Sequence, residues 1–137
     1  MPDLAPLRVI YADDDESVRN LIGSFLLDQG VDIHTCSNAN DALKLVDSVE
    51  PNVVVLDLVM PGMDGYQAAR HIRDRDRHGR VRLIALTGVE SPDTLERATH
   101  AGFDEFLKKP VSGRVLLGAL GKGFSPAPPP SAATLRP

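Results

Sequence analysis

The residues of this sequence that could carry chemistry are three aspartates, a threonine and a lysine, each at the end of a short apolar run or directly after one: Asp13, Asp14, Asp57, Thr87 and Lys109. Three carboxylates in one pocket repel each other, and either shifted pKa values or a hard cation with oxygen ligands relieves that repulsion. With a lysine nearby and few protein ligands, Mg²⁺ that keeps several of its waters fits better than Ca²⁺. A metal-neutralised carboxylate at a strand end can act as a nucleophile toward a phosphoryl group. The threonine hydroxyl, backbone N–H groups and the lysine would then bind the phosphoryl oxygens.

The apolar runs alternate with segments of helical period, which is typical of repeated βα units around a parallel sheet. The predicted strands span residues 7–12, 31–35, 53–57, 82–86 and 104–107, and the second and the last are short enough to be edge strands. The first predicted helix has its apolar positions over 18–26, with Asp15 and Glu16 at its start and Gly30 near its end. The other predicted helices cover 39–49, 65–74, 92–101 and 112–120, the last weakened by two glycines. The fold class is therefore α/β, a (βα)5 doubly wound sheet of five parallel strands.

This arrangement predicts where the polar residues meet. Open α/β sheets bind ligands at the carboxyl ends of their strands, and all five residues lie at such ends. If the strand order is 2-1-3-4-5, the first and third strands are neighbours, and Asp13, Asp14 and Asp57 converge in one crevice.

Composition excludes several classes of protein. The 137 residues amount to one domain, and a net charge of −4 disfavours a general nucleic-acid binder. No apolar run approaches the ~18 residues that span a bilayer, and no secretory signal is visible, so we expect a cytoplasmic protein without membrane contact. The single cysteine, Cys36, excludes an internal disulfide framework. We expect an N-terminal extension over 1–6, the folded domain over 7–123 and a flexible, Pro- and Ala-rich tail over 124–137 that resembles an interdomain linker.

Four motifs in the right order and spacing carry a family resemblance: Asp13-Asp14-Asp15, the Asp-Leu-Val-Met-Pro-Gly-Met-Asp-Gly run over 57–65, Thr87-Gly88 and Lys109-Pro110. Together they resemble the receiver domain of two-component response regulators, of the single-domain chemotaxis type or the hybrid-kinase type, over roughly residues 7–120. The resemblance implies the flavodoxin-like strand order 2-1-3-4-5. It also implies Mg²⁺-dependent transfer of a phosphoryl group from a phosphohistidine of a sensor kinase or a phosphotransfer protein.

The resemblance assigns roles to the acidic residues. Asp57 corresponds to the phosphoacceptor, and Asp14 and Asp57 to direct Mg²⁺ ligands. Val59 would contribute its backbone carbonyl to the metal, and Asp13 would act mainly through water. Such a domain is a signalling switch that catalyses only its own phosphorylation and dephosphorylation.

The resemblance also assigns the switch residues. Thr87 corresponds to a hydroxyl that moves toward the phosphoryl group, and Lys109 to the ammonium that pairs with it, followed by a cis bond to Pro110. Phe106 stands where the family keeps a rotating aromatic side chain, and it lacks the hydroxyl that a tyrosine would offer. Val89 and the residue two places beyond Asp57 are both aliphatic, so we expect slow autodephosphorylation.

The output is expected to be protein contact through the face around the fourth helix, fifth strand and fifth helix, without direct DNA binding. A phosphorylation-dependent dimer is left open. The main alternative is a phosphate-independent, receiver-like interaction module. An aspartyl-nucleophile hydrolase of the haloacid dehalogenase type is disfavoured, because its second aspartate would stand at Val59. The six arginines of residues 70–82 indicate a solvated helix end rather than a nucleic-acid contact.

Overall fold

The computed structural model describes residues 7–76, 79 and 81–121. The predicted extension over 1–6 and the predicted tail over 124–137 lie outside these residues, so the domain boundaries stay predictions. Within the described part, five strands alternate with five helices along the chain. None of these helices has both the length and the apolar character that crossing a membrane requires.

The strands form one parallel sheet in the order β2-β1-β3-β4-β5, which confirms the predicted fold class and strand order. The strands are β1 Arg8–Ala12, β2 Asp32–Cys36, β3 Val53–Asp57, β4 Arg82–Thr87 and β5 Glu105–Lys108. The helices are α1 Glu16–Asp28, α2 Ala39–Val49, α3 Gly65–Arg75, α4 Pro92–Ala101 and α5 Gly113–Gly121. As expected, the second and the last strands are the two edges of the sheet.

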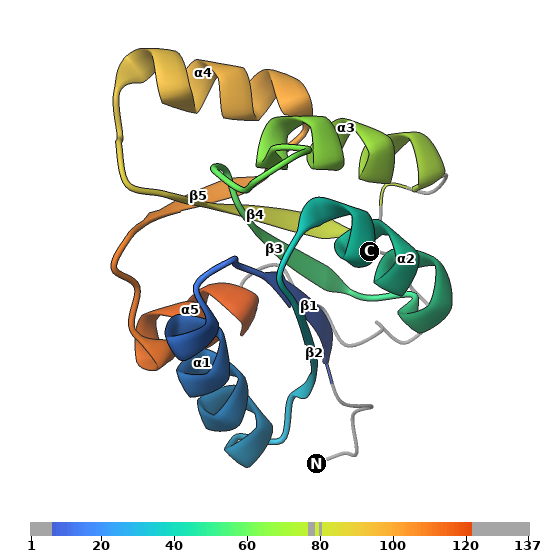
Figure 1. The fold of residues 1–137 in the computed structure, drawn as a ribbon, viewed down its shortest axis with the longest axis vertical. Coiled ribbons are helices and arrows are strands. Elements are labelled where there is room, and N and C mark those ends of the chain that lie inside the picture. The colour runs from blue at the N-terminus through green and yellow to red at the C-terminus, as the bar shows by residue number, and fades with distance from the viewer. Residues whose placement is uncertain (1–6, 77–78, 80, 122–137) are drawn as a thin grey trace, which may run out of the picture.

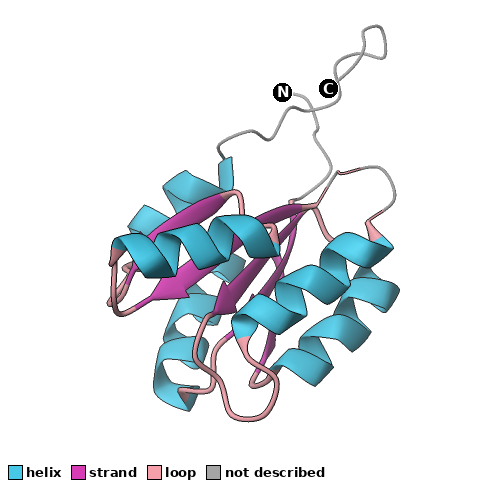
Figure 2. Ribbon diagram, turned by 90° about the horizontal axis from the view of Figure 1, so that it is seen from above, coloured by secondary structure: helices cyan, strands magenta, loops and turns pink. Residues whose placement is uncertain are grey.

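Helices cover both faces of the sheet. In Figure 1, α1 and α5 lie on one side of the strands and α2, α3 and α4 on the other, and Figure 2 shows the same two helical layers from above. All five residues of β3 are buried, and their side chains alternate between the two cores. Val54 and Leu56 pack toward α2 and α3, while Val53 and Val55 pack toward α1 and α5. This burial on both faces explains the continuously apolar sequence of the central strand.

The first helix begins at Glu16, as expected from Asp15 and Glu16, because the Asp15 side chain caps it by accepting a hydrogen bond from the Val18 N–H. One boundary at a strand end differs from the sequence-based expectation. The strand β4 extends to Thr87, which pairs with Lys108 of β5, so Thr87 ends the strand instead of following it.

The helix α5 forms despite its glycines, because its apolar face is buried by tertiary packing. Leu116 and Leu120 are fully buried against the core that α1 also covers. A Cβ at Gly113 would lie 2.5 Å from the Phe25 ring, so the glycine lets α5 approach α1 closely. The burial outweighs the cost of about 1 kcal/mol that a glycine adds in a helix interior.

Candidate functional site

The predicted acidic crevice exists at the carboxyl ends of β1 and β3. These strands are adjacent, with Ala12 paired to Leu56, so the residues that follow Ala12 lie beside the end of β3. Carboxylate oxygens of Asp13, Asp14 and Asp57 lie within 4.8 Å of one another. Asp13 and Asp57 are buried, whereas Asp14 is exposed at the mouth of the crevice.

Asp57 is held by donors on both carboxylate oxygens. The Lys109 Nζ donates to Oδ2 at 2.7 Å, and the Val59 N–H donates to Oδ1 at 3.1 Å. Burial raises the pKa of the Asp57 carboxyl above its ordinary value, and the nearby Asp13 adds to this, although Lys109 and the Val59 N–H oppose the shift. The charge on Asp57 is therefore costly to keep in the folded state, and an additional cation would stabilise it.

Lys109 is positioned by the end of the sheet. Its backbone N–H donates to the Thr87 carbonyl at 2.8 Å, and its peptide bond to Pro110 is cis. Burial lowers the pKa of Lys109, but the hydrogen bond to Asp57 and the charges of the three aspartates outweigh this and raise the pKa above its ordinary value. The lysine thus remains an ammonium facing the carboxylate.

Asp13 is fully buried and is also bonded through both oxygens. The Tyr11 hydroxyl donates to Oδ2 at 2.9 Å, and the Asp15 N–H donates to Oδ1 at 3.0 Å. The backbone around it is fixed as well, because the Arg19 side chain donates to the Asp13 carbonyl and the Asp13 N–H donates to Cys36 of β2. Burial, followed by the charge of Asp13, raises the pKa of Tyr11, so the phenol stays protonated and acts as the donor.

The loop from 58 to 64 folds back over the end of β3. The Leu58 N–H donates to the Leu86 carbonyl at 3.0 Å, and the Gly65 N–H donates to the Leu58 carbonyl at 3.1 Å. A Cβ at Gly65 would lie 2.5 Å from the Asp57 carbonyl oxygen, so only glycine allows α3 to start this close to β3. Asp64 and Gln67 form a capping box that begins α3.

The predicted switch residues lie at the same end of the sheet but are not all joined to Asp57. The Thr87 hydroxyl donates to the Val89 carbonyl at 2.6 Å and accepts from the Val89 N–H at 3.0 Å. Thr87 is buried, and its hydroxyl is turned toward its own loop. Phe106 of β5 is partly buried and packs against the core on the α2, α3 and α4 side.

The donor set fits Mg²⁺. Three carboxylates offer hard oxygen ligands, and Asp14 at the exposed mouth leaves room for the waters that this ion keeps. Val59 is exposed beside them, and the use of its backbone carbonyl as a ligand stays a prediction. Within the part of the chain that the structure describes, this is the only cluster of three or more acidic, histidine or cysteine side chains with such geometry, and no histidine belongs to it.

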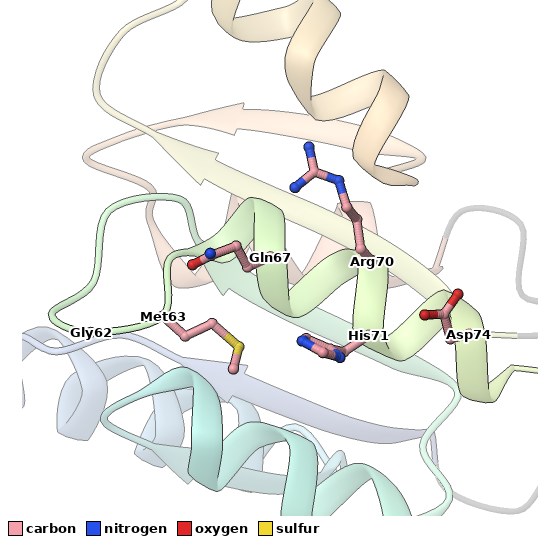
Figure 3. A pocket seen from close by; sticks show the side chains of 6 residues that line it. All are labelled: Gly62, Met63, Gln67, Arg70, His71 and Asp74. Carbon is pink, nitrogen blue, oxygen red and sulfur yellow. The ribbon is translucent and has the colours of Figure 1, made fainter.

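An open pocket of about 530 Å³ lies elsewhere, along α3 and the loop before it. Figure 3 shows the residues that line it: Gly62, Met63, Gln67, Arg70, His71 and Asp74. None of the clustered aspartates is among them, so this pocket is separate from the acidic crevice.

The arginines of residues 70–82 are partly used inside the protein. Arg73 bonds to Asp104 at 2.7 Å, and Arg82 is paired with Glu105 of β5. Two of the six, Arg77 and Arg80, lie outside the described residues. The pairing accounts for part of the positive charge without a nucleic-acid partner.

Two residues that support the site were missed by the sequence interpretation. The sequence pattern places Tyr11 only within the first predicted strand, and it singles out neither Tyr11 nor Arg19. A signal for Tyr11 was present, because residues two apart on a strand face the same way, so its hydroxyl could reach Asp13. No comparable signal marked Arg19, because its bond to the Asp13 carbonyl depends on how α1 packs.

Known proteins share this sequence pattern and this fold. The family model of the response regulator receiver domain matches residues 9–121. Protein PilG of Pseudomonas aeruginosa is 30% identical over 83% of this chain and 84% of its own length. The CAI-1 autoinducer sensor kinase/phosphatase CqsS of Vibrio cholerae is 31% identical over 80% of this chain but only 16% of its own length.

Among solved structures, the chemotaxis protein CheY4 of Vibrio cholerae superposes with a TM-score of 0.80 at 26% identity, covering 85% of this chain and 97% of its own. The agreement thus extends from the strand-end motifs to the order of the whole sheet. With its match over residues 9–121, this chain belongs to the response regulator receiver domain family.

Proposed function

We propose that this chain accepts a phosphoryl group on Asp57 from a phosphohistidine of a sensor kinase or a histidine phosphotransfer protein, with Mg²⁺ bound at the acidic crevice. The observation that carries the proposal is the grouping of the buried Asp57 with two further carboxylates and with the Lys109 ammonium at 2.7 Å. A solvated turn aspartate would have neither the burial nor these partners.

In the proposed reaction, an Asp57 carboxylate oxygen attacks the phosphorus atom, and the P–N bond to the imidazole breaks. The electron pair of that bond stays on the imidazole nitrogen, and an aspartyl phosphate is formed. Lys109 exchanges its bond to the carboxylate for one to a phosphoryl oxygen. Mg²⁺ held by Asp14, Asp57 and the Val59 carbonyl, with Asp13 acting through water, would neutralise charge on the phosphoryl oxygens.

The switch would start at Thr87. Its hydroxyl must leave the Val89 carbonyl, to which it donates at 2.6 Å, before it can donate to a phosphoryl oxygen. Because Phe106 lies on the neighbouring strand β5, a shift of the β4–α4 loop would alter the packing around its ring. The changed surface around α4, β5 and α5 would then bind the downstream protein or a second copy.

The family supports a signalling role with a histidine kinase or a phosphotransfer protein as donor. The match to 16% of CqsS, named a sensor kinase/phosphatase, supports an arrangement in which such a segment is part of a kinase chain. The match covers 84% of PilG, which suits a stand-alone regulator. The proposal also includes a cytoplasmic location.

The test is phosphorylation by acetyl phosphate with Mg²⁺, followed by intact-mass measurement. We expect one acid-stable, base-labile phosphoryl adduct on the wild type, and none on Asp57→Asn or after chelation of Mg²⁺. An adduct that persists in Asp57→Asn would place the acceptor elsewhere. No adduct, together with no cation binding, would favour the phosphate-independent interaction module.

A further inference from the structure

The side chain of Tyr11 links the core of the sheet to the acidic crevice. Tyr11 lies on β1 two residues before Asp13, so both side chains face the same side of the strand. Tyr11 is fully buried in the core on the α1 and α5 side of the sheet. From there the phenol hydroxyl donates to Asp13 Oδ2 at 2.9 Å.

This hydrogen bond leaves part of the Asp13 carboxylate available. A carboxylate has about four lone-pair sites, and the Tyr11 hydroxyl and the Asp15 N–H each use one, on different oxygens. Each oxygen therefore keeps an acceptor site, and oxygens of Asp13 lie within 4.8 Å of those of Asp14 and Asp57. The two donors fix the orientation of the carboxylate without saturating it.

We propose that Tyr11 is a positioning residue of the acidic crevice: its hydroxyl holds the Asp13 carboxylate in the orientation that receives the hydrated cation. This inference rests on the proposed function, because it needs a cation at Asp13, Asp14 and Asp57. The Tyr11 hydroxyl donates to Asp13 and not to Asp57, so we expect its effect on the cation to pass through Asp13.

Two physical effects of removing the hydroxyl oppose each other. Without the bond, Asp13 can rotate away from the cation, which weakens binding. The hydroxyl also competes for electron density on Oδ2, so its loss would strengthen binding. Hydrogen-bond partners of metal-binding groups are worth about 10–100-fold in metal affinity when removed, and Asp13 acts through water, so we expect the lower end of that range.

The variant Tyr11→Phe removes the hydroxyl and keeps the ring. The chain has two tyrosines and no tryptophan, which supplies a matched control in Tyr66→Phe. Tyr66 is buried on α3, with Arg97 over its ring at 4.1 Å, and has no part in the crevice as described above. Both variants lose one phenol oxygen from a buried ring.

The experiment titrates Mn²⁺ into each protein, follows the free ion by electron paramagnetic resonance and displaces it with Mg²⁺. We expect Tyr11→Phe to bind about tenfold more weakly than the wild type, and Tyr66→Phe to match the wild type. In phosphorylation by acetyl phosphate, Tyr11→Phe should need more Mg²⁺ than the wild type to reach half of its maximal phosphorylation rate. At saturating Mg²⁺ it should be phosphorylated at the wild-type rate. Unchanged or tighter binding in Tyr11→Phe would overturn the positioning role.

A second measurement covers the case in which Tyr11→Phe does not fold. In Tyr66→Phe, Tyr11 is the only remaining tyrosine, so its fluorescence reports on the bond to Asp13. Added Mg²⁺ should change the intensity of this emission, with its midpoint at the Mg²⁺ concentration that displaces half of the bound Mn²⁺. An emission that does not change when Mg²⁺ binds would contradict the inference. The proposed function itself fails if the wild type binds no cation, or if Asp57→Asn binds the cation as tightly as the wild type does. That result differs from wild-type cation affinity in Tyr11→Phe, which would contradict only the role of Tyr11.

Discussion

The Lys109 ammonium donates a 2.7 Å hydrogen bond to Asp57 Oδ2, joining residues 52 positions apart in the chain. Asp57 ends β3 and Lys109 follows β5, and the whole of β4 lies between these strands. The bond therefore crosses the carboxyl end of β4. It pairs the proposed acceptor with a cation before any phosphoryl group arrives, and the lysine can transfer to a phosphoryl oxygen without a large movement.

Asp57→Asn should be more stable than the wild type in the absence of Mg²⁺, by an amount that depends on pH. The pKa of Asp57 is raised from 3.8 by burial, so the folded state keeps its proton to higher pH than the unfolded state does. Wild-type stability therefore falls as pH rises from 3.8 through the raised value. The asparagine does not titrate, and its advantage should grow across that window and then level off.

Urea unfolding of the two proteins in chelator at a series of pH values measures this difference. Most other titrating groups are common to both proteins and largely cancel. The pKa of Lys109 is raised partly by Asp57, so the comparison is made at acidic pH, where Lys109 carries its proton in both proteins. Added Mg²⁺ should reduce the difference in unfolding free energy between the two proteins, because it stabilises the wild type. If the wild type gains stability relative to Asp57→Asn as pH rises, the pKa of Asp57 is lowered in the folded state and not raised.

The aspartyl phosphate of the wild type should be long-lived. Val59 and Val89 are 80% and 61% exposed beside the site, and neither can orient or deprotonate the attacking water. Val59→Asn should speed the loss of the phosphoryl group by roughly tenfold, a small share of the 10²–10⁴ that full general acid–base catalysis provides. The decay of the adduct, followed by intact mass after acetyl phosphate is removed, gives both rates.

Val59→Ala is the matched control for that experiment, because it changes size without adding a polar group. It should decay at nearly the wild-type rate. A wild-type half-life of seconds, or equal decay of the asparagine and alanine variants, would contradict the role assigned to these valines.

Gly65→Ala should destabilise the fold by about 1–3 kcal/mol, the usual cost of forcing an extra carbon into a packed site. The added Cβ would lie 2.5 Å from the Asp57 carbonyl oxygen and 2.8 Å from the Leu58 Cα, and backbone atoms cannot rotate away. Urea unfolding measures the loss, and acetyl phosphate reactivity should fall as the end of β3 shifts.

Gly118→Ala in α5 is the control. No heavy atom lies within 4 Å of the Cβ it would add, and alanine is favoured over glycine in a helix by about 0.5–1 kcal/mol. The two alanine substitutions should therefore change stability in opposite directions. A neutral Gly65→Ala would mean that α3 can move away from β3 at little cost.

Arg73→Met should cost on the order of 2 kcal/mol of stability, since hydrogen bonds to charged groups are worth about 1.5–3 kcal/mol. The guanidinium of Arg73 donates to the carbonyls of Val81 and Gly102 and to the Asp104 carboxylate, which ties α3 to the residue before β4 and to the turn before β5. Methionine keeps the apolar stem and removes these donors. Arg70→Met, at an exposed position on the same helix, should stay within about 0.5 kcal/mol of the wild type.

Much of the local structure was predictable, because it depends on residues close together in the chain. The bounds of α2, β3 and α4 match the predicted ranges, since apolar periodicity and the caps at Asn38 and Ser91 lie within a few residues of each element. The acidic residues were placed at strand ends for the same reason. The strand order is implied by the family resemblance. The alternation of strands and helices along the chain does not give it, because that alternation is compatible with several strand orders.

The tertiary structure decided what the acidic crevice contains and how it is charged. The bonds from Lys109 to Asp57 and from Arg19 to the Asp13 carbonyl depend on packing between elements, as does the close approach at Gly65. The raised pKa of Asp57 likewise follows from burial that no local pattern reveals. Sequence periodicity specifies which side of an element is apolar, whereas distances across the sheet are set only when all its layers pack together.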